Sequence, residues 1–531
     1  MIYLGITGCV NGNVTHDASA CLIEDNKILA IAEEERFVRF KHSFNLFPTY
    51  SIKYCLNHAG ISLKDVDKIG YYSDPKAYKL FYWKNLKRNI VVLRLKHDFK
   101  KIYEKLHFHF GFRPKKVHFV EHSLCHAYSS FPLSGFKNNM CFSIEAGGEE
   151  TSTAVLKGGK TIKSFPLSNS LGWMYTEATE WLGFERNEGE GKTMGLAPYS
   201  NNFLDWSDVI SFNINGEYKI KKNIYNYLVK KYGNRRYGEI QQVHKDVAAT
   251  VQYYLEKAVL NMLEYYRPKK LTMAGGVGLN CKMNGALLAS GIIDDIFITP
   301  MANDGGCSLG AAVYLAIEDG FKFKPLTHIC YGPGFTDEEI KKVLDRNMLS
   351  YEYHDDIAGI TAELLAKGKI VGWFQGRMEA GPRALGNRSI LADPRIAGMK
   401  DRINNFVKHR EPWRPYCPSI IDKFRNKYFE TDYPSPFMIL SFKVKEEKIK
   451  EIPAVVHVDG TTRPQTVTKK QNPLYYSLLD NFRKETGVPI LLNTSFNIRG
   501  QPIVCSPTDA LAMFFSEGMD ALAIGNYLLK K

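Results

Sequence analysis

The sequence lacks the features that mark secreted, membrane-spanning and cysteine-ligated metal proteins. Its first twenty residues have neither a basic start nor a sustained apolar stretch, so we expect no signal peptide. Charged residues interrupt every longer apolar run, which argues against a transmembrane helix. The ten cysteines are scattered without a C-x-x-C pair, which argues against a cysteine zinc site or a redox pair. Scattered cysteines without a secretion signal favour the reducing cytosol, so we expect a cytoplasmic protein.

Internal repeats and low-complexity segments are also absent from the sequence. A chain of 531 residues is too long for one hydrophobic core, so we expect two or more domains. With 31 Phe and 30 Tyr, the composition indicates folded globular domains rather than disorder.

Acidic residues are scarcer than basic ones, at 56 against 70, which gives a net charge of +14. Part of the excess lies in residues 84–116, where eleven residues are basic and two are acidic. Two interpretations stay open. The stretch is a solvated helical face, or it is a surface for an anionic partner such as a nucleotide, an acidic glycan or a membrane-held acceptor.

The hydrophobic pattern at the start of the chain predicts three strands. Residues 1–8 form one apolar run, and residues 19–26 and 27–35 predict a hairpin that turns at the polar residues 24–26. A strand, a loop and a hairpin in this order are typical of the actin/hexokinase-type nucleotide-binding fold. The fold class that we predict is therefore α/β.

Helices are predicted at several later positions, and strands such as LTMAGG and KIVGWFQG lie between them. The predicted helices cover residues 49–60, 84–106, 246–266 and 356–367. Glycine, proline and a helix-start pattern at 331–339 predict a domain boundary. We therefore expect one domain at 1–335 and a second at 336–531.

His122 and His126 are candidate metal ligands, because four-residue spacing on a helix places both imidazoles on one face. Glu145 ends the predicted strand MCFSIE, and Asp304 ends the predicted strand IFITPMAND, each before a glycine turn. Two His with one or two carboxylates suit iron(II), manganese(II) or zinc. The alternative is that both carboxylates only cap the helices that follow them.

Two further features of the N-terminal half are candidates for chemistry. His16 follows the first strand beside Asp17, so it is a candidate general base, with a purely structural histidine as the alternative. Gly275 and Gly276 follow a strand and open a helix, where backbone amides can approach an anion or a nucleotide.

The densest functional signal lies in the C-terminal half, in GRMEAGPRALGNRSILADPR, VKHREPWRPYCPS, HVDGTTRPQTV and NTSFNIRG. Arginine forks match phosphate oxygens, and here they stand among Gly, Pro and Asn in predicted turns, where function concentrates. This pattern predicts an anion site. Its candidate residues are Arg377, Arg383, Arg388, Lys408, Arg410, Arg414, Arg463, Ser495 and Asn497.

These stretches, with HDASA, EEERFVRFKH, GKTMGLAPY and AGGVGLN, resemble the NodU/CmcH family of O-carbamoyltransferases. The resemblance covers almost the whole chain. It implies an N-terminal actin/hexokinase-type, TsaD-like duplicated α/β domain and a C-terminal YrdC-like α/β domain. It also implies carbamoyl phosphate and ATP as substrates, Mg²⁺, and Fe²⁺ or another divalent transition metal.

The resemblance assigns roles to individual positions of this chain. His122, His126, Glu145 and Asp304 fall at metal-ligand positions, and His16 falls at the position of the catalytic histidine. The adenylation site then takes Lys408, Arg414, Met438, Arg463, Ser495 and Asn497, with Ser495–Asn497 matching the S-x-N signature of YrdC-like domains.

One departure from the family pattern concerns the metal site. Family members carry Asp-Gly-x-Gly-Glu where this chain has Glu145-Ala146-Gly147-Gly148-Glu149. Glutamate is one methylene longer than aspartate, so its carboxylate must reach the metal from further back or bind it differently. Ala146 replaces a glycine that adopts positive φ at little cost.

The implied activity is formation of carbamoyl-adenylate, followed by transfer of the carbamoyl group to a hydroxyl of a small-molecule or glycan acceptor. Nucleic acid is not an expected partner, and a homodimer is the default assembly. Three rivals stay open: a tRNA threonylcarbamoyl-type transferase, a kinase of the actin/hexokinase-type fold, and a non-catalytic nucleotide-binding partner protein. The sequence does not identify the acceptor.

Overall fold

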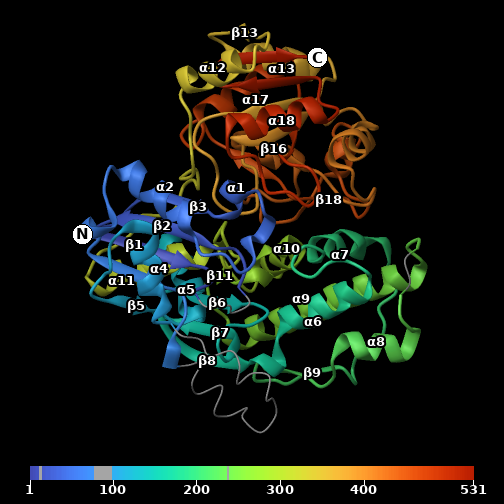
Figure 1. The fold of residues 1–531 in the computed structure, drawn as a ribbon. Coiled ribbons are helices and arrows are strands. Elements are labelled where there is room, and N and C mark those ends of the chain that lie inside the picture. Colours follow the sequence, from blue (N-terminus) through green and yellow to red (C-terminus); the bar gives the residue numbers. More distant parts are fainter. Residues whose placement is uncertain (11–14, 77–98, 236–237) are drawn as a thin grey trace. The chain divides into compact units, whose positions relative to one another are not determined.

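The computed structural model describes residues 1–10, 15–76, 99–235 and 238–531. They form two compact units, shown in Figure 1. The N-terminal unit comprises 1–34 and 42–326, and the C-terminal unit comprises 35–41 and 327–531. The short segment 35–41 therefore belongs to the C-terminal unit, although it follows the first hairpin in sequence.

The N-terminal unit contains two five-stranded sheets with the same strand order, β3-β2-β1-β4-β5 and β8-β7-β6-β11-β12. In each sheet, three antiparallel strands are followed by two parallel ones. This repeated topology is a duplicated actin/hexokinase-type domain, so the predicted fold class is confirmed. The strands are β1 (Ile2–Thr7), β2 (Ser19–Glu24), β3 (Lys27–Glu33), β4 (Lys68–Tyr71), β5 (Val117–Phe119), β6 (Met140–Ile144), β7 (Thr151–Lys157), β8 (Lys160–Pro166), β11 (Lys270–Ala274) and β12 (Asp295–Ile298).

The predicted hairpin between β2 and β3 is confirmed. Asp25 lies in the turn at φ 54°, a left-handed conformation that Asp tolerates better than most residues. Strand β1 is buried along all but its first residue, as expected for an unbroken apolar strand with neighbours on both sides.

The strand predicted to end at Asp304 is shorter than expected. Strand β12 ends at Ile298, and Asp304 lies in the turn that leads into α11 (Gly306–Glu318). Pro300 follows β12 closely, and proline has no N–H to continue a strand ladder. The carboxylate is therefore placed by the start of a helix and not by a strand.

The last helices of the two halves, α5 (His122–Tyr128) and α11, pack directly against each other. Glycine makes the close contact possible, because a Cβ on Gly310 would lie 1.7 Å from the backbone oxygen of Cys125. On another side of α11, a Cβ on Gly5 of β1 would lie 1.8 Å from the Ser308 oxygen. Backbone contact thus fixes α5, which carries both candidate histidines, against α11.

Most predicted helices are confirmed, with small shifts at their ends. They are α2 (Thr49–Ala59), α9 (Gln242–Tyr266) and α13 (Ile357–Ala366). Of the predicted helix 84–106, the part 84–98 lies outside the described residues, and the rest contributes to α4 (Lys101–Phe110). The start pattern near 336 is the capping box of α12 (Asp337–Arg346), made by Thr336 and Glu339.

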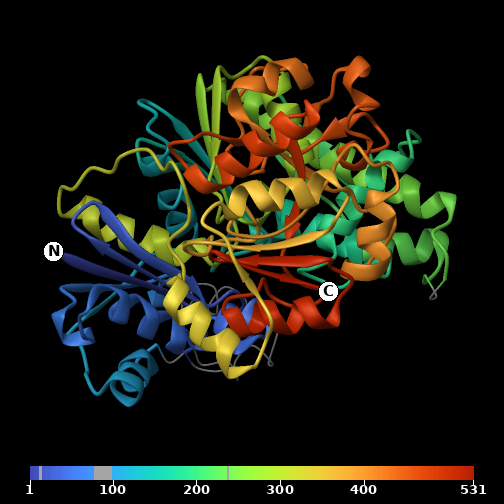
Figure 2. The same cartoon turned by 90° about the horizontal axis from the view of Figure 1, so that it is seen from above.

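The C-terminal unit is built on one mixed eight-stranded sheet, in the order β13-β22-β21-β14-β15-β20-β16-β19. Helix α13 packs beside α17 (Pro473–Thr486), and α12 contacts α18 (Pro507–Ser516), seen in yellow and red in Figure 2. The strands are β13 (Glu352–Tyr353), β14 (Val371–Phe374), β15 (Arg388–Ala392), β16 (Cys417–Ile421), β19 (Gln465–Val467), β20 (Ile490–Ser495), β21 (Ala521–Ile524) and β22 (Tyr527–Lys530).

All ten cysteines carry free thiols, as expected for a chain without paired cysteines. Among the helices of the described ranges, none combines the length and the apolar character that crossing a bilayer requires.

A single methyl group at Gly310 should separate α5 from α11. We expect Gly310→Ala to lower the free energy of unfolding of the N-terminal unit by about 1–3 kcal/mol, because the added Cβ clashes with backbone that cannot rotate away. The control is Gly191→Ala, also helical, where the new Cβ meets nothing within 4 Å. Calorimetry should show this control to be neutral or more stable, and equal destabilisation of both variants would contradict the packing argument.

Candidate functional site

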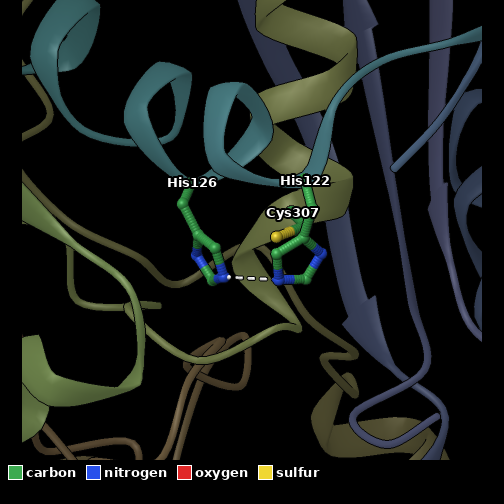
Figure 3. Close-up of side chains that lie close together, drawn as sticks. All are labelled: His122, His126 and Cys307. Carbon is green, nitrogen blue, oxygen red and sulfur yellow. Dashed lines mark hydrogen bonds between the residues drawn. The ribbon is translucent and has the colours of Figure 1, made fainter. Parts of the chain in front are cut away.

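The paired histidines converge at the start of α5 (Figure 3). The Nε2 atoms of His122 and His126 lie 3.1 Å apart, and both side chains are buried. The prediction that both imidazoles share one helix face is therefore confirmed.

Two carboxylates meet the histidine pair. Glu145 Oε2 lies 2.6 Å from His122 Nε2 and 3.2 Å from His126 Nε2, and Asp304 Oδ1 lies 3.4 Å from His126 Nε2. One donor atom from each of the four side chains lies within 4.8 Å of the others. Neither carboxylate caps a helix, because Ser170 caps the helix after Glu145 and α11 begins without a side-chain cap. The capping alternative is thus wrong.

The donor set fits a divalent cation. Burial lowers the pKa of both imidazoles, but the carboxylates outweigh it and raise the pKa of His122 and His126 to about 10. Two protonated Nε2 atoms 3.1 Å apart repel each other, whereas two neutral ones can bind a single ion. At a metal–nitrogen length of about 2.1 Å, cis ligand nitrogens stand roughly 3.0–3.4 Å apart. The observed separation of the rings lies in that range.

At the departure from the family pattern, the longer Glu145 side chain reaches the cluster without backbone strain at Ala146. Ala146 keeps a negative φ, unlike the residues of the chain that adopt left-handed backbone. Ser170 Oγ donates to the backbone oxygens of Glu145 and Ala146, at 3.1 and 2.6 Å. Gly172 admits this approach, because a Cβ there would lie 2.4 Å from the Ala146 nitrogen.

Glu149 positions His122 from the backbone side. The His122 N–H faces the Glu149 carboxylate at 3.2–3.3 Å, and the Asp74 N–H donates to it at 2.8 Å. Burial raises the pKa of Glu149. Gly148 completes the fit, since a Cβ there would lie 3.1 Å from the His122 ring.

His16 is hydrogen-bonded to Asp17 and faces the cluster through an ion-pair contact with Asp304. Its Nδ1 lies 3.1 Å from Asp17 Oδ2, and its Nε2 lies 3.9 Å from Asp304 Oδ2. The other oxygen of Asp17 lies 2.8 Å from His42 Nδ1, so one carboxylate holds two imidazoles. With Nδ1 hydrogen-bonded to Asp17, Nε2 is the ring atom of His16 that faces Asp304. Burial lowers the pKa of His16, but Asp304 and Asp17 raise it to about 9.

Gly275 and Gly276 have different surroundings. Gly275 has φ 86°, and a Cβ there would lie 2.3 Å from the oxygen of Ile144, directly before Glu145. It therefore serves the packing of β11 against β6. Gly276 is exposed and faces open space.

In the C-terminal unit, Lys408 is enclosed by the S-x-N turn. Its Nζ donates to Ser495 O at 2.8 Å and to Asn497 Oδ1 at 2.8 Å. Lys408 ends the π-helical turn η8 (Asn404–Lys408), an irregularity that often marks functional sites. Burial, Arg410 and Arg414 lower the pKa of Lys408 well below its usual value.

Several arginines gather around this lysine. Burial and Arg410 lower the pKa of Arg414 to about 10, and Arg463 adds to the effect. Arg410 stacks on Tyr416 at 4.3 Å, and Arg463 donates to Cys417 Sγ at 2.9 Å. Lys41, from the segment 35–41, also lowers the pKa of Lys408. An anion would relieve the mutual repulsion of these cations.

Other predicted anion-site residues lie in different surroundings. Arg388 is fully buried, stacks on Phe374 at 3.6 Å, and donates to the backbone oxygens of Gln375 and Pro333 at 2.6 and 3.0 Å. Its guanidinium therefore holds loops together, while its backbone oxygen accepts from Phe496 N–H beside the S-x-N turn.

Three more of these residues lie on loops. Arg377 donates to the backbone oxygen of Gly332 at 3.1 Å, and Arg383 is half-buried before β15. Met438 is buried and has φ 56°, a left-handed backbone conformation that is strained for most residues other than glycine.

Reasoning from the sequence missed four residues around the N-terminal cluster: Asp17 as a bridge, His42, Glu149 and Cys307. Asp17 follows His16 directly, and Glu149 lies four residues after Glu145, so sequence proximity could have indicated both as site residues. His42 and Cys307 come from distant parts of the chain, and only folding brings them to the cluster.

Comparisons with known proteins agree with the resemblance. A family model described as carbamoyltransferase N-terminus matches residues 6–313, and one described as carbamoyltransferase C-terminus matches 362–531. Nodulation protein NolNO of Sinorhizobium fredii is 40% identical over 97% of this chain and 79% of its own length. An uncharacterized protein of Methanocaldococcus jannaschii, MJ1051, is 32% identical over 97% of this chain and 98% of its own.

Solved structures that align with the chain include T. kodakarensis HypF, at a TM-score of 0.34 and 10% identity over 60% of this chain and 48% of that one. The fold assignment depends on the strand order of the two sheets and not on this weak similarity. The matched family models, the NolNO relative and the motifs agree over nearly the whole length, and they show that the chain belongs to the NodU/CmcH family and is a carbamoyltransferase.

Proposed function

We propose that the protein is an ATP-dependent O-carbamoyltransferase with one half-reaction in each unit. The observation that carries this proposal is the pairing, in one chain, of a buried histidine–carboxylate cluster with a separate group of cations around Ser495–Asn497. The first suits carbonyl chemistry, and the second suits nucleotide phosphates. Family membership supports the carbamoyl group as the one transferred.

The C-terminal unit would form carbamoyl-adenylate from carbamoyl phosphate and Mg²⁺-ATP. Water hydrolyses carbamoyl phosphate to carbamate and inorganic phosphate. A carbamate oxygen then attacks the α-phosphorus of ATP, and pyrophosphate leaves. Lys408, Arg414 and Arg463 neutralise the charge that develops on the phosphoryl oxygens. The S-x-N turn holds the Lys408 ammonium in place for this role.

The N-terminal unit would transfer the carbamoyl group to an acceptor hydroxyl. In its neutral form, His16 accepts the hydroxyl proton at Nε2 as the oxygen attacks the carbamoyl carbon, and AMP leaves. Asp17 holds the His16 ring in the tautomer that exposes Nε2.

His122, His126, Glu145 and Asp304 are the residues that would hold a divalent transition metal such as Fe²⁺. When bound, such an ion supplies Lewis acidity toward the carbamoyl carbonyl. We propose a small-molecule or glycan acceptor. Ten free thiols support a reducing, cytoplasmic setting.

Removing one cation from the C-terminal site should abolish the first half-reaction. With ATP, Mg²⁺ and carbamoyl phosphate, we expect Arg463→Ala to form pyrophosphate and carbamoyl-adenylate at least about 100-fold more slowly, because one donor to the developing charge is lost. The products are measured by mass spectrometry without any acceptor. Arg483→Ala, which removes a partly exposed ion pair with Asp480 in the same unit, is the control and should match the parent. Parental adenylate formation by Arg463→Ala would refute the assigned site.

Changing Asp17, the carboxylate that bridges His16 and His42, should slow the transfer half-reaction alone. In Asp17→Asn the amide would present an N–H to His16 Nδ1 and favour the wrong tautomer, so we expect AMP release with an accepted hydroxyl compound to fall by about 10²–10⁴-fold. Adenylate formation should stay at the parental rate. A variant that loses both half-reactions equally, or neither, would show that Asp17 does not position His16.

A further inference from the structure

Cys307 lies beside the histidine pair but plays no part in the chemistry described above. It stands in the first turn of α11, three residues after Asp304, and its N–H donates to the Asp304 backbone oxygen at 2.9 Å. The Cys307 thiol is completely buried. Figure 3 shows its sulfur next to the two rings.

The histidine pair is shared by two donor sets. One contains Glu145 and Asp304, and the other contains the Cys307 sulfur, with one nitrogen from each imidazole within 4.8 Å of it. A buried cysteine is often only a small apolar core residue, and Cys307 also packs in the core around β1. A purely structural core position would not require two imidazole nitrogens within 4.8 Å of the sulfur.

We infer that Cys307 supplies a thiolate ligand to the cation held by His122 and His126, so that the site selects borderline and soft divalent ions. The expected order places Fe²⁺, Co²⁺ and Zn²⁺ above Mn²⁺ and Mg²⁺. This inference rests on the metal centre of the proposed function and narrows the identity of the metal in it.

The chemistry of the step is ligand exchange without oxidation or reduction. The Cys307 S–H bond breaks, a metal–sulfur bond forms, and the proton leaves to solvent. Burial raises the pKa of the Cys307 thiol well above its usual value. Binding as a thiolate would therefore release a proton for each cation bound.

The selectivity follows from the softness of the donors. Carboxylates serve Mg²⁺ and Mn²⁺ as well as transition metals, whereas thiolate favours thiophilic ions such as Zn²⁺. A set of two imidazoles and one thiolate therefore offers hard ions fewer useful ligands. A site with carboxylates and histidines alone also binds Mn²⁺ more weakly than Zn²⁺, but by a smaller margin than a site with a thiolate.

The test is the absorption spectrum of the full-length protein loaded with Co²⁺ alone. We expect one bound Co²⁺ per chain with a sulfur-to-cobalt charge-transfer band, which Cys307→Ser removes while the ligand-field bands of bound Co²⁺ persist. Cys125→Ser is the matched control. Its thiol is equally buried, lies between the two histidines in sequence and donates to Val120 O, so the charge-transfer band should remain.

Each outcome decides a separate point. Bound Co²⁺ without the band in the parent, or a band that survives Cys307→Ser, overturns the role of Cys307 and leaves the metal centre intact. Failure of the parent to bind Co²⁺ overturns the metal centre and this inference together.

Two further measurements guard against a variant that misfolds. X-ray absorption of the Co²⁺-loaded parent should show a sulfur neighbour at about 2.3 Å, and a shell of only nitrogen and oxygen would overturn the inference. In competition experiments, Cys307→Ser should lose at least about tenfold of the preference for Zn²⁺ over Mn²⁺. An unchanged preference for Zn²⁺ over Mn²⁺ in Cys307→Ser would also overturn the inference.

Discussion

Four ionisable side chains meet in the N-terminal unit, three of them buried and Asp304 partly buried, and their charges have to be balanced where they lie. Glu145 and Asp304 bring two negative charges to a site that water cannot screen well. In the protein alone, protons on His122 and His126 balance them, at the cost of two like charges 3.1 Å apart. One divalent ion supplies the same charge and removes that repulsion.

The surrounding structure serves this arrangement. Glycine at 310 lets α5 reach α11, and glycine at 275 lets β11 reach the end of β6, so the four side chains come from elements in backbone contact. Glu149 fixes the start of α5, and the bridge through Asp17 orients His16 toward Asp304.

The C-terminal unit presents the opposite problem, because Lys408 is buried among Arg410, Arg414 and Lys41. An anion such as a nucleotide phosphate would balance that site.

Much of this could be predicted from the sequence, because the signals were local. The helical spacing of His122 and His126, the first hairpin and the capping box of α12 each depend on a few neighbouring residues. The duplication could not be predicted from an internal repeat. The two halves share strand order and not side-chain pattern, and strand order appears only when the sheets are formed.

Long-range placement accounts for what the sequence did not reveal. Arg388 belongs to the motif with the most arginines, yet its guanidinium donates its hydrogen bonds to the backbone oxygens of Gln375 and Pro333. Likewise, segment 35–41 belongs to the C-terminal unit, and its Arg39 donates to the Pro502 and Ile503 oxygens. Such contacts depend on which loops meet in the fold, and one sequence carries no local mark of them.

The most direct test of the balanced cluster is metal content measured together with thermal stability. Protein stripped with a chelator would be titrated with Fe²⁺ under anaerobic conditions, and bound iron and the unfolding midpoint would be recorded for the parent and for His126→Ala. The account predicts one ion per parent chain and a higher midpoint, since saturation at 100 times Kd stabilises a protein by about 2.7 kcal/mol. His126→Ala should bind little iron and gain little stability. A parent that binds no divalent transition metal, with a midpoint that metal leaves unchanged, would contradict the account.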